Sequence, residues 1–223
     1  MKKTYPVLQR CRLFTGISEA DMKILLDCLS ARQKHYRKNS FIFLAGEKMD
    51  SVGIVLSGAV HVLREDFWGR RKIMARVEGG GLFGEAFACA DVEKIPVSVM
   101  AAEESDVLFI NSRLIYTSCR AACSFHSAVM KNLSLLLAEN NMALMQKLEY
   151  ITQPTTREKL LSYLSEQARL AGKSAFDIPF NREELADYLS VERSAMSAEL
   201  SKMQGDGLLS YHKNHFELMS SEQ

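Results

Sequence analysis

One face of a predicted helix near the end of the chain combines small hydroxyl side chains with an arginine. In residues 182–200 the apolar side chains are spaced so that two helices share a small core across a turn at residues 189–191. With Met196 pointing into that core, the opposite face and its flank carry Arg193, Ser194, Ser197, Ala198 and Ser201. Small side chains allow close approach, hydroxyls can donate to phosphates or base edges, and arginine can bind guanine O6 and N7. This chemistry predicts a helix that enters the major groove of DNA.

The stretch after these two helices favours the same interpretation. Residues 207–218 alternate around a Lys213–Asn214 turn, which predicts a two-stranded hairpin. A helix-turn-helix followed by a hairpin is a winged helix. We then expect Lys213 at the tip of the wing and Arg182 at the start of the first helix to contact DNA. The alternative is an ordinary helical pair with a solvated serine face.

The distribution of charge restricts how DNA could be bound. The chain has 28 Lys and Arg against 27 Asp and Glu, and a net charge of +1 by itself argues against a nucleic-acid partner. Residues 1–151 hold 20 basic and 16 acidic side chains, whereas residues 152–223 hold 8 and 11. The predicted DNA-binding part is therefore acidic, and its positive charge must lie mainly at Arg182, Arg193, Lys202 and Lys213. We expect few phosphate contacts, a shallow salt dependence and a need for two copies on one DNA site.

The middle of the chain predicts an all-β module. Short apolar runs, spaced about 10 residues apart and separated by glycines and acidic turns, are typical of an antiparallel sandwich or barrel. The runs cover residues 41–44, 52–56, 59–63, 72–77, 97–101 and 107–110.

Residues 113–151 predict one long helix, because glycine is absent and the apolar period lengthens. Leu137, Leu144 and Ile151 repeat every seven residues with Asn140 and Asn141 between them, like a short coiled-coil seam in which a polar residue fixes the register. The alternative is a helix that only packs on the β module. Pro154 ends the helix, so we expect domains at 1–112, 113–151 and 152–223.

Taken in order, these motifs resemble the Crp/Fnr family of bacterial transcription factors, which includes the cyclic-AMP receptor protein and the fumarate-nitrate reductase regulator. The resemblance spans nearly the whole chain and is carried by residues 46–47, 56–60, 81–86, 182–186 and 207–209. It implies an α+β protein with an N-terminal β-roll of the cyclic-nucleotide-binding jelly-roll type, preceded by helices, then a dimerisation helix and a winged helix-turn-helix. It also implies a homodimer that binds double-stranded DNA at a two-fold symmetric site, responds to a small-molecule effector and contacts RNA polymerase.

Two positions of the recognition helix depart from many family members. Arg193 stands where the family carries a base-reading arginine. Ala198 stands where many members have a second basic residue, and Ser194 where many have a glutamate that accepts from cytosine. We therefore expect a different half-site preference.

The β-roll also departs from members that bind cyclic AMP. In those proteins a Gly-Glu pair is followed by an Arg-Ser pair that holds the cyclic phosphate. This chain keeps Gly84-Glu85 but has Ile95-Pro96 at the second pair, and Met142-Ala143 replaces the Thr-Ser pair that reads adenine. An unpaired buried phosphate is unfavourable, so we expect an effector other than cyclic AMP. The expected pocket, suited to an uncharged or carboxylate-bearing organic molecule, is lined by Gly84, Glu85, Ala86, Pro96, Val97 and Asn141.

Other sensor chemistry remains open as an alternative within the family. The five cysteines have irregular spacing, which suits a reducing compartment and not a disulfide framework or the iron-sulfur motif. Cys119, Cys123 and His126 share a helical spacing that could offer ligands to zinc, although buried thiols are the favoured interpretation. A haem could use His35, His61 or His126.

Several function classes are disfavoured. No catalytic pattern such as Gly-x-Ser-x-Gly or a Walker motif occurs, so we expect no enzyme. A cyclic-nucleotide-type module that controls a protein partner such as a kinase is a further alternative, which the C-terminal winged helix argues against. No apolar run is long enough to span a membrane and no signal core follows Met1, so we expect a cytoplasmic protein.

Overall fold

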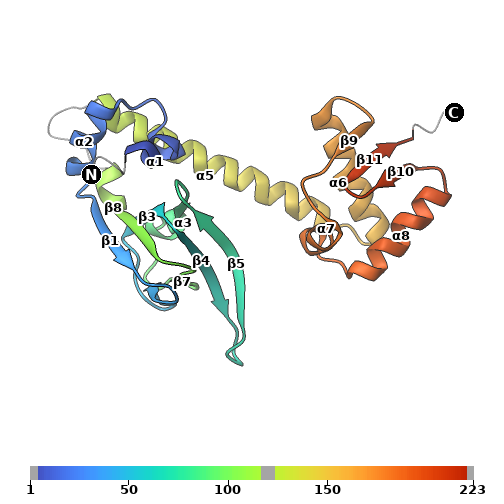
Figure 1. Ribbon diagram of the computed structural model, residues 1–223, viewed down its shortest axis with the longest axis horizontal. Helices are drawn as coiled ribbons and strands as arrows, with labels where there is room; N and C mark the ends of the chain where they lie inside the picture. The colour runs from blue at the N-terminus through green and yellow to red at the C-terminus, as the bar shows by residue number, and fades with distance from the viewer. Residues whose placement is uncertain (1–4, 117–123, 220–223) are drawn as a thin grey trace. The chain divides into compact units, whose positions relative to one another are not determined.

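The computed structural model describes residues 5–116 and 124–219, and the chain divides into two compact units, Met1–Ala138 and Glu139–Gln223 (Figure 1). The boundary lies inside α5 (Ser124–Ile151), so that this helix contributes residues to both units. The three domain limits expected from the sequence remain predictions.

The first unit is a β-roll made of two four-stranded antiparallel sheets. The sheet orders are β1-β8-β3-β6 and β2-β7-β4-β5. The strands are β1 (Arg32–Tyr36), β2 (Phe41–Phe43), β3 (Ser51–Ser57), β4 (Ala59–Glu65), β5 (Arg71–Glu78), β6 (Leu82–Phe83), β7 (Ser98–Ala101) and β8 (Ser105–Asn111). All six predicted apolar runs are confirmed as strands. β1 was missed because four of its five side chains are exposed, and β6 because it has only two residues.

Short helices and the first part of α5 close the core of the roll (Figure 1). The helices are α1 (Tyr5–Arg10), the 3-10 turn η1 (Arg12–Phe14), α2 (Glu19–Cys28), α3 (Glu85–Cys89) and α4 (Ser112–Tyr116). Val129 and Leu133 of α5 are fully buried in the same cluster as the strands. The Asn132 amide donates to the carbonyl oxygens of Leu13 and Thr15, at 3.0 and 2.9 Å. This end of α5 is therefore an integral part of the β-roll.

The single helix expected over residues 113–151 is wrong. Nε2 of His126 on α5 lies 2.7 Å from the carbonyl oxygen of Leu114 on α4. Twelve residues of continuous helix would separate these positions by about 18 Å. Ile115 of α4 and Val129 of α5 are buried in the same core, so apolar residues occur at helical spacing in both helices. This spacing alone does not show that the two helices run in different directions. Residues 117–123 lie outside the described part of the chain.

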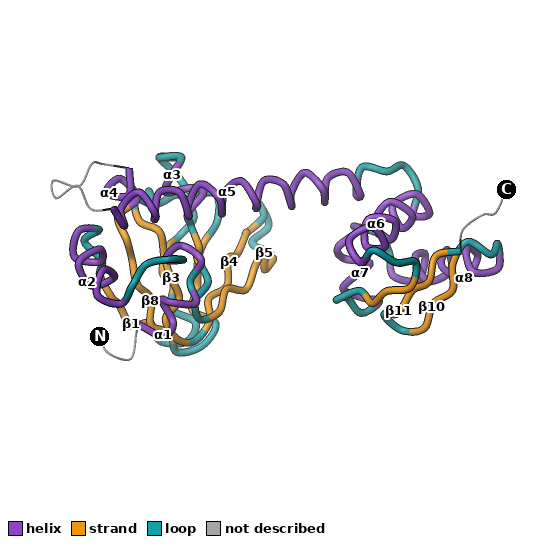
Figure 2. Tube along the Cα trace, turned by 90° about the horizontal axis from the view of Figure 1, so that it is seen from above, coloured by secondary structure: helices purple, strands orange, loops and turns teal. Residues whose placement is uncertain are grey.

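The second unit combines the end of α5 with a winged helix (Figure 2). Its elements are α6 (Thr156–Ala171), β9 (Ala175–Asp177), α7 (Arg182–Leu189), α8 (Arg193–Gly205), β10 (Leu209–His212) and β11 (His215–Leu218). The strands form an antiparallel sheet in the order β10-β11-β9. The predicted hairpin is confirmed, whereas β9, the third strand of its sheet, was not predicted.

Local signals account for the ends of these helices. Thr155 caps α6 in a capping box with Glu158, and Gly172 ends that helix in the left-handed conformation. Asn181 caps α7 in a second capping box with Glu184. Ser190 makes the turn between α7 and α8 in the left-handed conformation, with a φ of 53°. The chain therefore enters and leaves α7 at defined angles, which positions α8.

None of the described helices is both long and apolar enough to cross a membrane.

Candidate nucleic-acid interface

Helix α8 has a buried face and a small, polar exposed face. Met196, Leu200 and Met203 are fully buried, in the direction that the helical spacing predicted. Leu185, Ala186 and Leu189 of α7 complete the shared core. The predicted DNA-facing residues lie at the surface: Arg193, Ser194, Ala198 and Ser201 are exposed and Ser197 is half-buried. The core thus fixes which side of α8 is presented to solvent.

The three serines of this face already use their hydroxyl hydrogens. Ser197 Oγ donates to the carbonyl oxygen of Arg193 at 2.9 Å, and Ser201 Oγ donates to that of Ser197 at 3.0 Å. Ser194 Oγ donates to a carboxylate oxygen of Glu192. The sequence suggested that these hydroxyls donate to DNA, and in the structure each of them donates to an oxygen of α8 or of its N-cap.

Glu192 lies beside the predicted DNA-facing residues, and the sequence reasoning did not single it out. Its exposed carboxylate caps α8 by accepting from the Ala195 backbone N–H at 2.7 Å. The hydrogen bond from the Ser194 side chain, followed by those from the backbone of Ser194 and Ala195, lowers the pKa of Glu192. A negative charge therefore stands at the N-terminus of the recognition helix. Its position between the turn at Ser190 and the first apolar residue of α8 could have identified it as the N-cap from the sequence.

Arg182 connects α7 to the wing. Its guanidinium carbon lies 4.5 Å from the ring centroid of Tyr211 and 4.9 Å from that of Phe216. Burial lowers the pKa of Arg182, and its Nη2 is buried without a hydrogen-bond partner among the described residues. Such a donor is costly to leave unsatisfied, so an acceptor of negative charge arriving at this position would be favoured.

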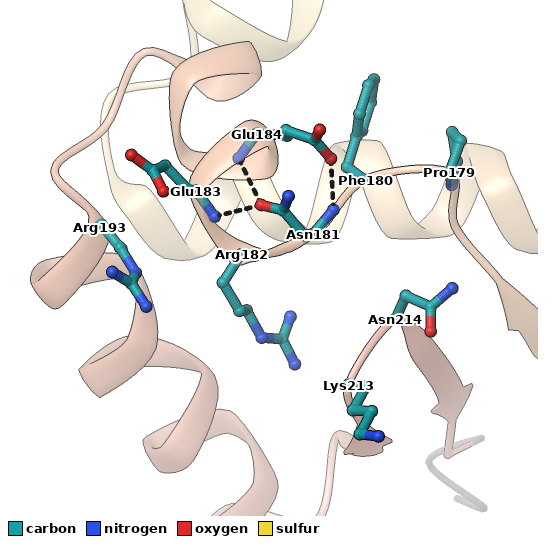
Figure 3. Close-up of a pocket in the computed structure, with 9 residues that line it drawn as sticks. All are labelled: Pro179, Phe180, Asn181, Arg182, Glu183, Glu184, Arg193, Lys213 and Asn214. Carbon is teal, nitrogen blue, oxygen red and sulfur yellow. Dashed lines mark hydrogen bonds between the residues drawn. The ribbon is translucent and has the colours of Figure 1, made fainter.

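Three cations from different elements surround one cleft of about 640 Å³ (Figure 3). Arg193 comes from α8, Arg182 from α7 and Lys213 from the turn of the hairpin. The remaining lining residues are Pro179, Phe180, Asn181, Glu183, Glu184 and Asn214. The turn is anchored, because Asn214 and Ile178 exchange hydrogen bonds of 3.2 and 2.9 Å. The tertiary structure thus brings together three positions that lie up to 31 residues apart in the sequence.

Part of the acidic charge of this unit is neutralised within the unit. Arg157 pairs with Glu199 at 2.5 Å and with Asp206 at 2.6 Å. Lys202 lies 3.9 Å from Glu199 and keeps 70% of its side chain exposed. The net negative charge is therefore not uniform over the surface, and the cleft brings together Arg182, Arg193 and Lys213 with Glu183 and Glu184 also in its lining.

The residues expected to line an effector pocket fall in both units. Gly84 has a φ of 77° and begins α3, and a Cβ there would lie 2.2 Å from Met49 Cε. Glu85 and Val97 are half-buried, while Ala86 and Pro96 are exposed. Asn141 is exposed on α5 in the second unit.

Ile95 and Pro96, the two positions at which other family members hold a cyclic phosphate, carry no cationic side chain. Ile95 is 1% exposed, and its side chain belongs to the apolar core. Lys94 is exposed. A cavity of about 290 Å³ does lie on the roll, lined by Phe41, Leu44, Ala45, Leu63, Glu65, Arg71 and Ser98. None of the expected effector residues lines this cavity.

The thiols and imidazoles proposed as alternative sensors have varied environments. Cys119 and Cys123 lie outside the described residues, which leaves the zinc hypothesis untested. His126 is 7% exposed, His35 is exposed and pairs with Asp106 at 3.1 Å, and His61 is half-buried. Burial raises the pKa of the Cys11 thiol to about 11.

The second unit exposes an apolar strip on α5. Met142, Leu144, Met145 and Leu148 are 57–68% exposed. Together with residues of α6 that include Leu170, part of this strip lines a groove of about 830 Å³. Long apolar side chains in such a row are unusual on the surface of a protein that has no partner there.

Comparisons with known proteins agree with the order of these elements. Residues 33–120 match the cyclic nucleotide-binding domain, and residues 158–222 match the Crp-like helix-turn-helix domain. The transcriptional activator protein anr of Pseudomonas aeruginosa is 24% identical over 201 residues, covering 88% of this chain and 80% of that protein.

Solved structures show the same fold. The catabolite activator protein of Thermus thermophilus has a TM-score of 0.51 and 22% identity, and 93% of each chain is covered. The c-di-GMP-responsive global regulator CLP of Xanthomonas campestris has a TM-score of 0.53 and 16% identity, covering 90% of this chain and 99% of that one. With an N-terminal cyclic nucleotide-binding domain, a long helix and a C-terminal helix-turn-helix of the DNA-binding type, the chain belongs to the Crp/Fnr family of transcriptional regulators.

Proposed function

We propose that this regulator is a homodimer that binds a two-fold symmetric site in double-stranded DNA and reads each half-site with α8. The observation that carries the proposal is the cleft in which Arg182, Arg193 and Lys213 meet beside the exposed face of α8. Arg193 reads a base edge, and Arg182 and Lys213 hold backbone phosphate. The place of Arg182 in the lining of this cleft supports the phosphate contact.

The dimer forms through α5. The exposed strip that includes Leu144 and Leu148 supports this proposal, because pairing two copies would remove it from water. A second copy also compensates for the small number of cations in one winged helix, since two half-sites bound together give far higher affinity than one.

The signal is a small molecule or a redox change that acts at the β-roll and α5, and it is not cyclic AMP. The buried Ile95 and exposed Pro96 support this exclusion, because neither can neutralise a phosphate. The effector would bind the two arrangements of the dimer with different affinity and so change the spacing of the recognition helices. As part of the proposal the protein acts in the cytoplasm and contacts RNA polymerase.

Selection of bound fragments from genomic DNA tests the function. The protein is incubated with the fragments at moderate salt, under reducing conditions and with cell extract as a source of effector. We expect an inverted repeat with half-sites about one helical turn apart, near 10 base pairs from centre to centre. Enrichment of no symmetric site would contradict the proposal.

A further inference from the structure

The serines of α8 restrict what this helix can recognise. A carbonyl or an ionised carboxylate can only accept a hydrogen bond, so Ser197, Ser201 and Ser194 must be the donors in the contacts they make with such oxygens. Each hydroxyl has one hydrogen, and in each case it is already in use. What remains for a ligand is the lone pairs of the oxygen.

In a fourth contact, too, the serine oxygen acts as the acceptor. Ser201 Oγ and the Tyr211 hydroxyl are 3.4 Å apart. Since the hydrogen of Ser201 is donated to Ser197, the hydrogen in this contact comes from Tyr211. At the start of the helix the low pKa of Glu192 keeps its carboxylate ionised, which adds another group that only accepts.

Arg193, Ser197 and Ser201 are spaced four residues apart and therefore form one row along α8. Arg193 is a donor, whereas the two serines that follow it present acceptors. Backbone phosphates are acceptors, so they find no donor at these serines while the hydrogen bonds to Arg193 and Ser197 are kept. In the major groove the donors on base edges are the exocyclic amino groups, N6 of adenine and N4 of cytosine.

We infer that the serine face of α8 reads exocyclic amino groups of adenine or cytosine and does not hold backbone phosphate. Each base pair displays one such amino group in the major groove, so its position reports the orientation of the pair. Arg193 and the serines together would read an acceptor on one base and a donor on a neighbouring one. This inference rests on the proposed function and assigns the chemistry of the same surface.

The test removes single amino groups from the selected site. Purine replaces each adenine, and 2-pyrimidinone replaces each cytosine, one position at a time within a half-site. Binding of the full-length protein is measured with wild type, Ser197→Ala and Ser201→Ala. Ser165→Ala, an exposed serine on α6, is the matched control.

We expect at least one amino deletion to weaken wild-type binding by roughly 2- to 10-fold, as for loss of one hydrogen bond. The corresponding serine variant should bind the unmodified site more weakly by a similar factor and lose nothing further when that amino group is removed. Ser165→Ala should respond to the deletions as wild type does. Comparing variant and base analogue in one cycle cancels the effect of the analogue on base pairing.

Two results would overturn the inference. One is a serine variant that keeps the full sensitivity of wild type at every modified position. The other is a serine variant that weakens binding to all DNA sequences equally and reduces the salt dependence, because that pattern indicates a phosphate contact. Failure of wild type to bind any selected DNA would instead contradict the proposed function itself.

Discussion

The guanidinium of Arg182 stacks on the ring of Tyr211, with 4.5 Å between the guanidinium carbon and the ring centroid. This contact joins the first helix of the helix-turn-helix to the wing, and Phe216 at 4.9 Å completes it. The same arginine lines the cleft with Arg193 and Lys213, so a single side chain contacts the wing and contributes charge to the candidate interface.

Replacing the ring of Tyr211 should weaken DNA binding through Arg182. Tyr211→Leu removes the stack, for which we expect a loss of about 0.5–2 kcal/mol in binding free energy. Tyr211→Phe keeps the ring and should bind within about twofold of wild type. Fluorescence anisotropy with the selected DNA measures both variants. Equal losses in the two would show that the hydroxyl, and not the ring, matters.

Arg193→Ala should relax specificity at one base pair of each half-site. We expect a cost of about 1–3 kcal/mol on the preferred sequence and little change on unrelated DNA. Arg182→Ala should differ, because loss of a phosphate contact weakens binding to all sequences and lowers the salt slope by about one. Competition binding at several salt concentrations separates the two patterns, and identical profiles would contradict the assigned roles.

A charge on the exposed strip of α5 should break the dimer. Leu144→Asp and Leu148→Asp place a carboxylate in an apolar contact, so we expect monomers by sedimentation at micromolar concentration. Ile24→Asp is the control, because Ile24 is an apolar side chain 52% exposed on α2 and lies outside the strip. A dimer that survives both changes would exclude this strip as the interface.

The cap at Glu192 should make the winged helix sensitive to acid. The pKa of Glu192 is lowered in the folded protein, chiefly by the hydrogen bond from Ser194. Its stabilising effect is therefore present above the ordinary glutamate pKa of 4.5 and is lost as pH falls through the folded pKa. Glu192→Gln removes this ionisation. We expect urea unfolding of the variant to change less than that of wild type as pH falls below 4.5. Parallel stability curves for the two proteins would contradict this role.

The negative charge of Glu192 should also weaken DNA binding at the start of α8. The N-terminus of a helix favours a phosphate, and here the chain's own carboxylate stands in that place. Glu192→Asn keeps a capping oxygen and removes the charge, so we expect tighter binding to every DNA sequence with unchanged base preference. Glu149→Gln removes the same charge from an exposed position on α5 and should have little effect.

Much of the fold follows from local patterns. The apolar runs of the β-roll, the turn at Ser190 and the hairpin around Lys213 depend on neighbouring residues, and all of them were predicted. The missed strands show the limit of this reasoning: β1 is polar on its surface, and β9 is identified only by its pairing with β11. The single helix over 113–151 failed because periodicity describes which face is buried and not where the chain reverses.

By itself the sequence determined the order of the elements, the exposed small residues of α8 and the absence of an arginine at Ile95. Only the tertiary structure decided that Arg182 lies against Tyr211, that Arg193 and Lys213 share its cleft, and that Glu192 engages the hydroxyl of Ser194. Spacing and capping act between residues a few positions apart. The direction of a hydroxyl hydrogen and the meeting of distant cations depend on packing of the whole unit, because the core of α7, α8 and the wing sets the distances between them.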